Sequence, residues 1–266
     1  MQINLKFLAL LALLLIASTT ALIAQEVETD SVKKHTFFST NIDYQIKAQF
    51  SIGGASPLGF PSEIRKIESY NPTLQLGIGV NATKWFTDRQ KLGLRVGITF
   101  EGKCMKTQAK VKNYYTQIED NTGAQTRGYF TGHVTTNMKN SYLTVPISLV
   151  WNASKSWNFY GGFYFSALLE KSFSGYIYNG NFREGTPVGE LTVFENSTHG
   201  IYDFSSDLNG FQWGNQLGAE LKLKTNFNFF VDVTMGNLQI FNSDFEAISF
   251  KMYTIYANIG FAYTFY

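Results

Sequence analysis

Apolar and polar residues alternate along most of the chain after residue 40. Between Asn41 and Ile52, the even positions carry Ile, Tyr, Ala and Phe, while the odd positions after Asn41 carry Asp, Gln, Lys and Ser. Successive side chains of a β-strand point to opposite faces, so this pattern predicts a strand with one apolar and one polar face. A helix, with a period of 3.6 residues, falls out of phase with alternation within two turns. Seven further segments show the same pattern: 74–82, 92–100, 143–151, 157–169, 211–223, 227–235 and 253–265.

The connections between these segments alternate in length. Short turns follow the second, fourth and sixth segments, near residues 87–91, 153–156 and 224–226. Longer stretches follow the other segments, at residues 53–72, 102–141, 170–209 and 236–250. An even strand count, with short turns on one side and long loops on the other, is typical of outer-membrane barrels. The pattern predicts an all-β fold: a single eight-stranded antiparallel transmembrane β-barrel over residues 41–266, with both ends in the periplasm and four surface loops.

Alternation alone leaves open which face lies inside. A soluble barrel of the lipocalin type has apolar side chains inside, whereas a membrane barrel has them outside. The polar parity contains many small residues: Gly77, Gly79, Gly93, Gly97, Gly162, Gly214, Gly218 and Gly260. The interior of an eight-stranded barrel is just wide enough for side chains to fill, and the many large residues of the apolar parity do not fit there. We therefore expect the apolar face to contact outer-membrane lipid.

Aromatic residues cluster at the short-turn ends of the predicted strands. Their preference for strands explains their number but not this clustering. Because aromatic rings favour the membrane interface, we expect an aromatic girdle there. Its predicted members are Trp85, Trp151, Trp157, Phe159, Phe227, Phe229, Tyr263 and Phe265. Residues near the long-loop ends predict a second girdle at the opposite interface: Phe100, Phe211, Trp213 and Tyr253.

The first 24 residues have the layout of a secretory signal peptide. Lys6 precedes an apolar core, and small and hydroxyl residues follow it. A transmembrane anchor needs about 20 apolar residues, and Ser18 interrupts the run too early. Cleavage after Ala24, or alternatively after Ala21, would release an exported chain. We expect residues 1–24 to be a signal peptide and residues 25–40 to be a periplasmic leader.

Composition excludes several classes of function. Charged residues make up only 16% of the chain and aromatic residues another 16%, and the net charge is +2 without a long basic run, so we expect no nucleic-acid partner. Cys104 is the single cysteine, which excludes an intramolecular disulfide framework and a multi-cysteine zinc site. We expect no cofactor and no metal.

Charged residues on the polar parity suggest chemistry inside the lumen. They are Asp43, Lys47, Arg95, Glu101, Lys103, Glu220, Lys222 and Asp232. A tight hairpin of the sixth and seventh strands would place Glu220 nearly opposite Asp232, and two close carboxylates resist joint ionisation. We therefore expect Arg95 and Lys47 to pair with them, forming a lumenal charge cluster that plugs the barrel. A proton or ion path is the alternative.

Catalytic signals are weak. Barrel enzymes use a histidine with a hydroxyl or carboxylate near the outer rim, and the three histidines, His35, His133 and His199, show no spacing typical of a triad or a metal pair. The loops 102–141 and 170–209 are rich in Tyr, Asn, Gly and Thr and retain enough alternation to prolong their hairpins, with a turn near residues 120–123. Such surfaces suit protein or glycan contact, or simply shield the barrel.

Several motifs carry a resemblance to a known family. They are Ala24-Gln25, the stretch YLTVPISL at residues 142–149, the Gly-x-x-x-Gly-x-Glu stretch at 214–220 and the closing run FAYTFY. The chain resembles the Bacteroidota outer-membrane β-barrel family that includes the PorT-like proteins. The resemblance implies recognition of the last strand by the barrel-assembly machinery, and a link to type IX secretion. The residues of that assembly signal would be Tyr253, Ile255, Ile259, Phe261 and Phe265.

Three functions remain open at this point. The first is a non-enzymatic protein of the bacterial outer membrane, with a plugged lumen, that contacts envelope proteins through loops 102–141 and 170–209. The second is a small-solute channel. The third is a barrel enzyme that uses a loop histidine.

Overall fold

The computed structural model describes residues 41–59, 61–73, 75–87, 89–119, 123, 125–195, 197–223 and 226–265. The predicted signal peptide and leader lie outside the described residues. So does most of the predicted turn at 120–123. No described residue belongs to a helix that is long and apolar enough to cross a membrane.

The described residues form strands of one sheet, which confirms the all-β prediction. The strands are β1 (Ile42–Pro57), β2 (Ile64–Asn71), β3 (Leu76–Trp85), β4 (Leu92–Glu119), β5 (Gln125–Asn152), β6 (Trp157–Glu170), β7 (Phe173–Glu184), β8 (Leu191–Phe194), β9 (Gly200–Asp203), β10 (Phe211–Lys222), β11 (Phe227–Gly236) and β12 (Met252–Phe265). The eight segments with alternating residues lie on β1, β3, β4, β5, β6, β10, β11 and β12.

These eight strands pair in a closed cycle. The antiparallel pairs run β1–β3, β3–β4, β4–β5, β5–β6, β6–β10, β10–β11, β11–β12 and β12–β1. In the closing pair, Tyr44 of β1 lies opposite Phe265 of β12. Each of the eight strands therefore has a partner on both sides over the residues paired in this cycle, and the cycle presents no free edge. We call the space that it encloses the lumen.

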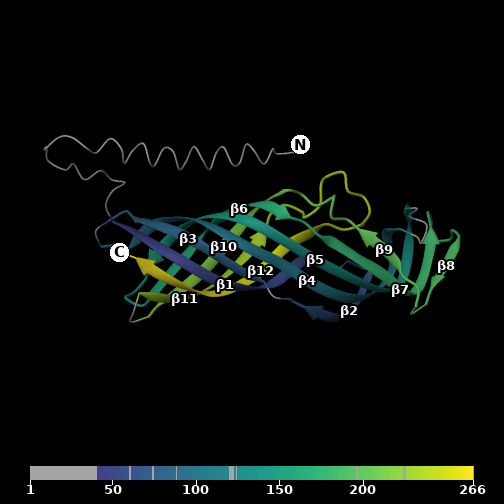
Figure 1. The fold of residues 1–266 in the computed structure, drawn as a ribbon, viewed down its shortest axis with the longest axis horizontal. Coiled ribbons are helices and arrows are strands. Elements are labelled where there is room, and N and C mark those ends of the chain that lie inside the picture. The colour runs from purple at the N-terminus through teal and green to yellow at the C-terminus, as the bar shows by residue number, and fades with distance from the viewer. Residues whose placement is uncertain are drawn as a thin grey trace. The chain divides into compact units, whose positions relative to one another are not determined.

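The remaining four strands extend the sheet beyond the cycle. β4 and β5 are 28 residues long, and their pairing continues from Leu92↔Trp151 to Glu119↔Gln125. β2 pairs with this extension of β4, β7 pairs with that of β5, and β8 and β9 pair with β7. Figure 1 shows β7, β8 and β9 at the end of the sheet away from the C-terminus. We call the described residues within 53–72, 102–141, 170–209 and 236–251 the distal part.

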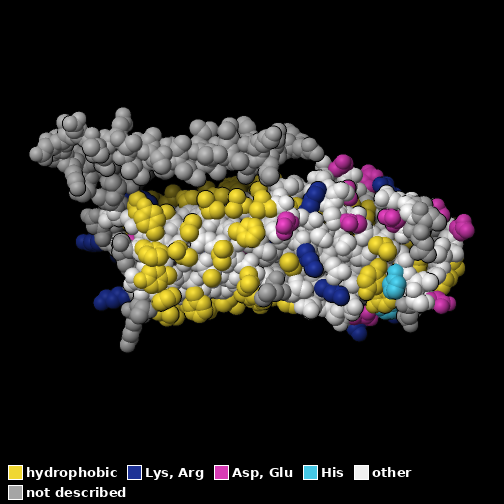
Figure 2. Space-filling view, viewed as in Figure 1, with side chains coloured by type: hydrophobic (Ala, Val, Ile, Leu, Met, Phe, Trp, Pro, Cys, Tyr) yellow, Lys and Arg dark blue, Asp and Glu magenta, His cyan; other side chains and the backbone are white. Residues whose placement is uncertain are grey.

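The polarity of the two faces reverses between the cycle and the distal part. On β4, the apolar residues of 92–100 occupy even positions and are exposed, whereas Met105 and Val111 occupy odd positions and are buried. Lys106 and Lys110 lie on the exposed parity of this second stretch. Figure 2 shows the same change, with apolar side chains gathered over one half and charged side chains over the other. The outside of the cycle is thus suited to lipid and the outside of the distal part to water.

The distal part has a hydrophobic core of its own. Buried aromatic and aliphatic side chains from β4, β5, β7 and the segment after β11 pack together there. Phe130, Ile177 and Met138 are among its most deeply buried members, and Tyr256 of β12 packs against them. Burial of apolar side chains is the main favourable term in folding, so this core stabilises the extension away from the cycle.

Candidate functional site

The lumen encloses a charge-balanced set of buried side chains. Three cations and three carboxylates are buried: Lys47, Arg95, Lys103, Glu101, Glu220 and Asp232. Isolated buried charges are costly, whereas paired and hydrogen-bonded charges are tolerated. The equal numbers of each sign leave this set without net charge.

Arg95 and Glu220 form the first buried pair. Nη1 of Arg95 lies 2.9 Å from Oε2 of Glu220, and both side chains are nearly inaccessible. Oε1 of Glu220 also accepts hydrogen bonds from Asn158 (3.2 Å) and Gln45 (3.3 Å). The guanidinium of Arg95 lies 5.3 Å from the ring centroid of Tyr160, within the range of a cation–π contact. The Glu220 carboxylate is therefore paired and held from three strands.

The partners of the Asp232 carboxylate differ from the prediction. This carboxylate accepts hydrogen bonds from three neutral donors, Tyr160 Oη, Gln216 Nε2 and Asn258 Nδ2, at 2.9, 3.1 and 2.6 Å. Lys47 does not form the expected ion pair with it; the Lys47 Nζ lies 5.8 Å from the ring centroid of Phe230. Glu220 lies opposite Phe230 and Asp232 opposite Gly218, so the two carboxylates are not directly opposed.

Glu101 and Lys103 form a second buried pair that the predicted cluster did not include. The two charged atoms lie 2.9 Å apart. Glu101 also accepts hydrogen bonds from Thr144 (2.7 Å) and Gln49 (3.0 Å). Three aromatic rings surround the Lys103 Nζ, those of Tyr142, Tyr164 and Tyr256, with centroids at 5.7, 5.3 and 5.0 Å. The sequence could have predicted this pair, because Glu101 and Lys103 are two residues apart on a strand and therefore share a face.

Very little space remains between these groups. Two small lumenal cavities have volumes of about 20 Å³ each. A cavity of this size holds about one water molecule. Both are lined by Lys47, Pro146 and Gln216, so these three side chains lie between them. Pro146 thus lies on the inward face of β5.

The predicted aromatic girdle was wrong for Trp85. This residue is only 3% exposed and packs in the lumen with Val150 and Tyr160. Its indole Nε1 donates a 2.6 Å hydrogen bond to Asp43. The physical reason is parity: the outward side chains of β3 occupy even positions, and residue 85 continues the inward row.

The other seven predicted girdle residues lie on the outward face. Phe229 is half-buried, and the rest are exposed: Trp151, Trp157, Phe159, Phe227, Tyr263 and Phe265. Neighbouring rings contact one another, with centroid distances of 6.2 Å for Trp157–Phe159 and 5.0 Å for Phe227–Tyr263. Within the predicted assembly strand, Ile259, Phe261 and Phe265 are exposed, and Tyr253 and Ile255 are half-buried on the same parity.

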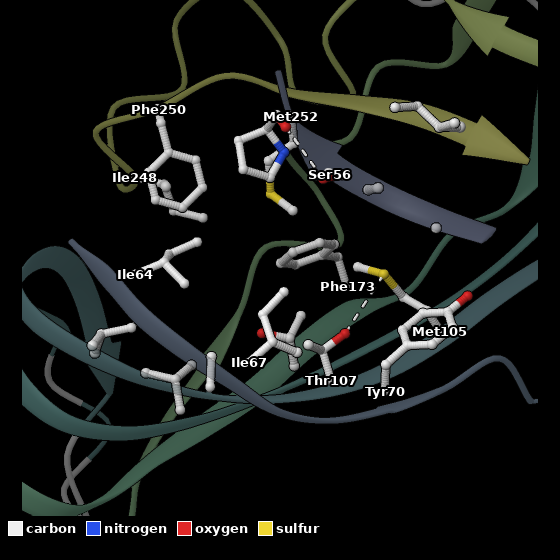
Figure 3. Close-up of a pocket in the computed structure, with 18 of the residues that line it drawn as sticks. Ser56, Ile64, Ile67, Tyr70, Met105, Thr107, Phe173, Ile248, Phe250 and Met252 are labelled. Atoms are coloured by element: carbon white, nitrogen blue, oxygen red, sulfur yellow. Dashed lines mark hydrogen bonds between the residues drawn. The ribbon is translucent and has the colours of Figure 1, made fainter. Parts of the chain in front are cut away.

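The distal part contains an apolar pocket of about 380 Å³ (Figure 3). One wall consists of side chains from β2 and β4, including Ile64, Ile67 and Met105. The segment before β12 supplies Ile248 and Phe250 on another side. Sequence reasoning missed this pocket because most of its residues lie in stretches that were expected to be loops.

The histidines lie on the distal part, away from the lumen. His133 Nε2 lies 3.5 Å from a carboxylate oxygen of Glu68, and its ring lies 5.5 Å from that of Tyr178. His199 contacts the rings of Tyr176 and Tyr178 at 4.9 and 6.2 Å. His35 lies outside the described residues. Within the described ranges, no group of three His, Cys, Asp or Glu side chains is arranged to hold a metal ion.

Several solved structures are similar to this chain. Ail, the attachment invasion locus protein of Yersinia pestis, solved with the heparin analogue sucrose octasulfate, is 9% identical; the match covers 85% of this chain and 100% of Ail, with a TM-score of 0.38. OprG from Pseudomonas aeruginosa is 13% identical over 84% of this chain and 96% of its own, with a TM-score of 0.30. Neisserial surface protein A is 11% identical over 85% and 98%, also with a TM-score of 0.30. No curated protein matches the chain.

A family model provides the assignment. The model of the outer membrane protein beta-barrel domain matches residues 24–242. This range contains seven of the eight strands of the cycle, from β1 to β11. The chain therefore belongs to the outer membrane protein beta-barrel domain family and is located in the bacterial outer membrane.

Proposed function

We propose that this protein crosses the outer membrane as an eight-stranded barrel with a closed, polar lumen, and that it acts without catalysis through its distal part. The observation that carries the proposal is the filled, charge-balanced lumen. A solute path through the barrel needs connected space. The two lumenal cavities of about 20 Å³ each provide none.

The reversal of polarity supports the placement in the membrane. Exposed apolar side chains cover the outward face of all eight strands of the cycle, and we call this surface the belt. Outer-membrane barrels carry such a band, about 25 Å tall, with aromatic residues at its borders. In the distal part, the outward-facing positions of β4 carry lysines instead, which favours exposure of the distal surface to water.

Paired charges explain how the plug stays closed. Removing one partner of a buried ion pair leaves an uncompensated charge, which costs more than the pair itself contributes. The Arg95–Glu220 pair joins β4 to β10 across the lumen, and Glu101–Lys103 lies among rings from β5, β6 and β12. Opening a water path would require these groups to separate.

Conductance in planar bilayers tests this proposal. The full chain should give no large steady currents, and the double variant Arg95→Ser with Glu220→Ser should raise the conductance by removing the pair that spans the lumen. Arg127→Ser is the matched control, because Arg127 is exposed and its contact with Glu246 is 3.9 Å long. Large steady currents from the wild type would overturn the plug and favour the small-solute channel.

The outer surface of the distal part is the proposed contact site for envelope proteins. Tyr176, Tyr178, His133 and His199 form a continuous group of rings on strands β5 and β7 and the segment before β9. Tyrosine and histidine side chains present both apolar area and hydrogen-bonding groups, which suits protein interfaces. The resemblance to PorT-like proteins makes type IX secretion the first envelope system to examine.

Co-purification from native outer membrane in mild detergent tests this contact. A partner that binds the ring group should be lost when Tyr176 and Tyr178 are both replaced by Ser. The pair Tyr115 and Tyr129, whose rings are 5.2 Å apart on β4 and β5, provides the control substitution. Equal loss in both double variants would contradict a contact at the ring group.

The histidine substitutions His133→Gln and His199→Gln test the enzyme alternative. Within the described ranges, neither imidazole has a hydrogen bond to a hydroxyl group. His133 Nδ1 instead lies 3.4 Å from the backbone carbonyl oxygen of Asn179. A lipid- or peptide-hydrolysing activity that disappears in these variants would contradict a non-catalytic role.

A further inference from the structure

We propose that the apolar pocket of the distal part binds the hydrocarbon chain of a fatty acid or membrane lipid, which enters from the belt. The site lies outside the lumen and is independent of the plug. Large steady currents through the wild-type protein would therefore contradict the plug but not the proposed pocket.

The pocket has the size and the chemistry of a ligand site. Small-molecule sites have volumes of about 300 to 1,000 Å³ and are mostly apolar, and this pocket measures about 380 Å³. None of its lining residues is charged. An apolar cavity is poorly filled by water, because a water molecule there lacks polar partners. The buried portion of the ligand is therefore uncharged and apolar.

The shape of the lining favours a linear chain. Alternate residues of β4 line the pocket from Met105 through Thr107 and Ala109 to Val111. Six residue steps along a strand extend roughly 20 Å. A compact aromatic molecule would leave much of that length empty, whereas an extended chain contacts it throughout. Figure 3 shows Ile64, Ile67 and Thr107 on one side, and Ile248, Phe250 and Met252 on the other.

The wall of the distal part is interrupted between β1 and β2. β3 pairs with β1 only as far as Phe50↔Leu76, and beyond that point β1 continues to Pro57. β2 pairs with β4 and with no other strand in the described part of the chain. The Tyr70 hydroxyl donates a 2.6 Å hydrogen bond to the Gly53 carbonyl across this interval. β2 is exposed on both faces, with Ile67 at 48% and Tyr70 at 44%.

The pocket is continuous with the belt. The outward row of β1 carries Tyr44, Ile46 and Ile52 on the belt, and the same parity continues into the pocket as Gly54 and Ser56. Ile52 is 40% exposed and itself lines the pocket. A hydrocarbon chain can therefore pass from the lipid-facing row into the pocket without crossing a charged surface.

Glycine at position 54 keeps this passage open. Sδ of Met105 lies 2.5 Å from the position that a Cβ atom would occupy on Gly54. A larger residue at this position would require the Met105 side chain to move. Met105 is flexible and polarisable, which suits a wall that adapts to a chain.

Photolabelling of the full chain in phosphatidylcholine nanodiscs tests the proposal. The probe in the first arm is palmitic acid with a terminal diazirine, and in the second arm it is phosphatidylcholine carrying the same chain. Peptide mapping by mass spectrometry should find labels on pocket residues such as Met105, Phe250 or Met252, and excess palmitic acid should remove them. Pocket labels in the first arm alone indicate a free fatty acid, and labels in the second arm indicate a lipid chain.

Two substitutions on neighbouring positions of β4 give a matched pair. Ala109→Phe fills the pocket and should reduce its labelling about tenfold, whereas Lys110→Phe points outward and should leave it unchanged. Val134→Phe fills the pocket from β5 and replaces Ala109→Phe if that variant fails the heat-dependent gel shift of a folded barrel. Labels confined to belt residues such as Val96 and Ile147, or pocket labels that neither excess palmitic acid nor the filling variants reduce, would overturn the proposal.

Discussion

Tyr160 of β6 lies directly opposite Gly218 of β10, and its ring occupies the space that a side chain on the glycine would need. A Cβ atom on Gly218 would lie 2.5 Å from the ring carbon Cζ. In this position the Tyr160 hydroxyl reaches Asp232 at 2.9 Å. Phe230 and Gly260 repeat the relationship between β11 and β12. The lumenal glycines thus make room for the rings that fill the barrel.

Adding a methyl group at Gly218 should destabilise the barrel. The methyl group displaces the Tyr160 ring and disturbs its hydrogen bond to Asp232, and such overpacking costs about 1 to 3 kcal/mol. Urea unfolding in lipid vesicles, followed by tryptophan fluorescence, measures the change for Gly218→Ala. In the control Gly102→Ala the new methyl group has its nearest neighbour at 3.8 Å and should have little effect. Equal stability of the two variants would contradict the packing role of Gly218.

Loss of the Arg95 guanidinium should cost more than loss of an exposed one. Arg95→Ala leaves Glu220 buried without its cation, which costs about 3 to 5 kcal/mol. Arg127→Ala removes an exposed contact and should cost less than about 1 kcal/mol. Adding Glu220→Gln to Arg95→Ala should restore part of the lost stability, because the unpaired charge is then gone. A double-mutant cycle on unfolding free energies measures this coupling, and a coupling near zero would contradict a paired plug.

Trp85 should be shielded from lipid, in contrast to Trp151 and Trp157. Brominated lipid chains quench indole fluorescence on contact, and Trp85 is buried in the lumen while the other two are exposed on the outward face. We expect Trp151→Phe and Trp157→Phe to reduce the quenched fraction in vesicles of brominated phosphatidylcholine. Trp85→Phe should increase that fraction, since it removes an emission that lipid cannot reach. A decrease in the quenched fraction for Trp85→Phe would instead place Trp85 in contact with lipid and contradict its position in the lumen.

A charge on the belt should be far more costly than the same charge on the distal surface. Val96 is exposed on the lipid-facing row of β4, and Arg near the middle of the membrane costs about 2 to 4 kcal/mol in such barrels. Ile201 on β9 is 60% exposed in the distal part, so Ile201→Arg should change stability by less than about 0.5 kcal/mol. Unfolding free energies in vesicles compare Val96→Arg with Ile201→Arg. Similar costs would contradict the boundary between belt and distal part.

The distal core should loosen at alkaline pH. Burial raises the pKa of Tyr202 above its ordinary value of 10.0, and burial does the same to Tyr114. A raised pKa in the folded state means that folding favours the neutral phenol. The contribution of these neutral phenols to the free energy of unfolding is therefore complete below about pH 10, and it is lost as the pH rises further. Hydrogen exchange of β7 and β9 amides should therefore accelerate above pH 10.

The variant Tyr202→Phe separates ionisation from the other effects of base. It removes the ionisable group together with the hydroxyl, which donates to the Thr135 carbonyl at 3.0 Å and lies 2.7 Å from Thr136 Oγ1. The variant should exchange faster than wild type at neutral pH and show a weaker acceleration above pH 10. The same alkaline acceleration in both proteins would assign the effect to other groups.

Local chemistry was sufficient to predict the eight strands with alternating residues. Side chains alternate along a strand whatever its partners are, so the faces of β1 or β12 could be read from their own residues. The distal part was also marked in the sequence, because the apolar parity of β4 changes between Phe100 and Met105. The inward position of Trp85 follows from the same rule once β3 is known to extend to residue 85.

Which inward residues contact one another depends on how the strands are assembled. The contact of Arg95 with Glu220, the neutral donors around Asp232 and the interval between β1 and β2 all depend on strand register and on which strands pair. These relationships join residues far apart in the chain, and their free energies depend on distance and burial rather than on the pattern within one strand. The order of residues within each strand sets which of its faces is apolar, whereas the closed lumen and the apolar pocket exist only because those strands are assembled.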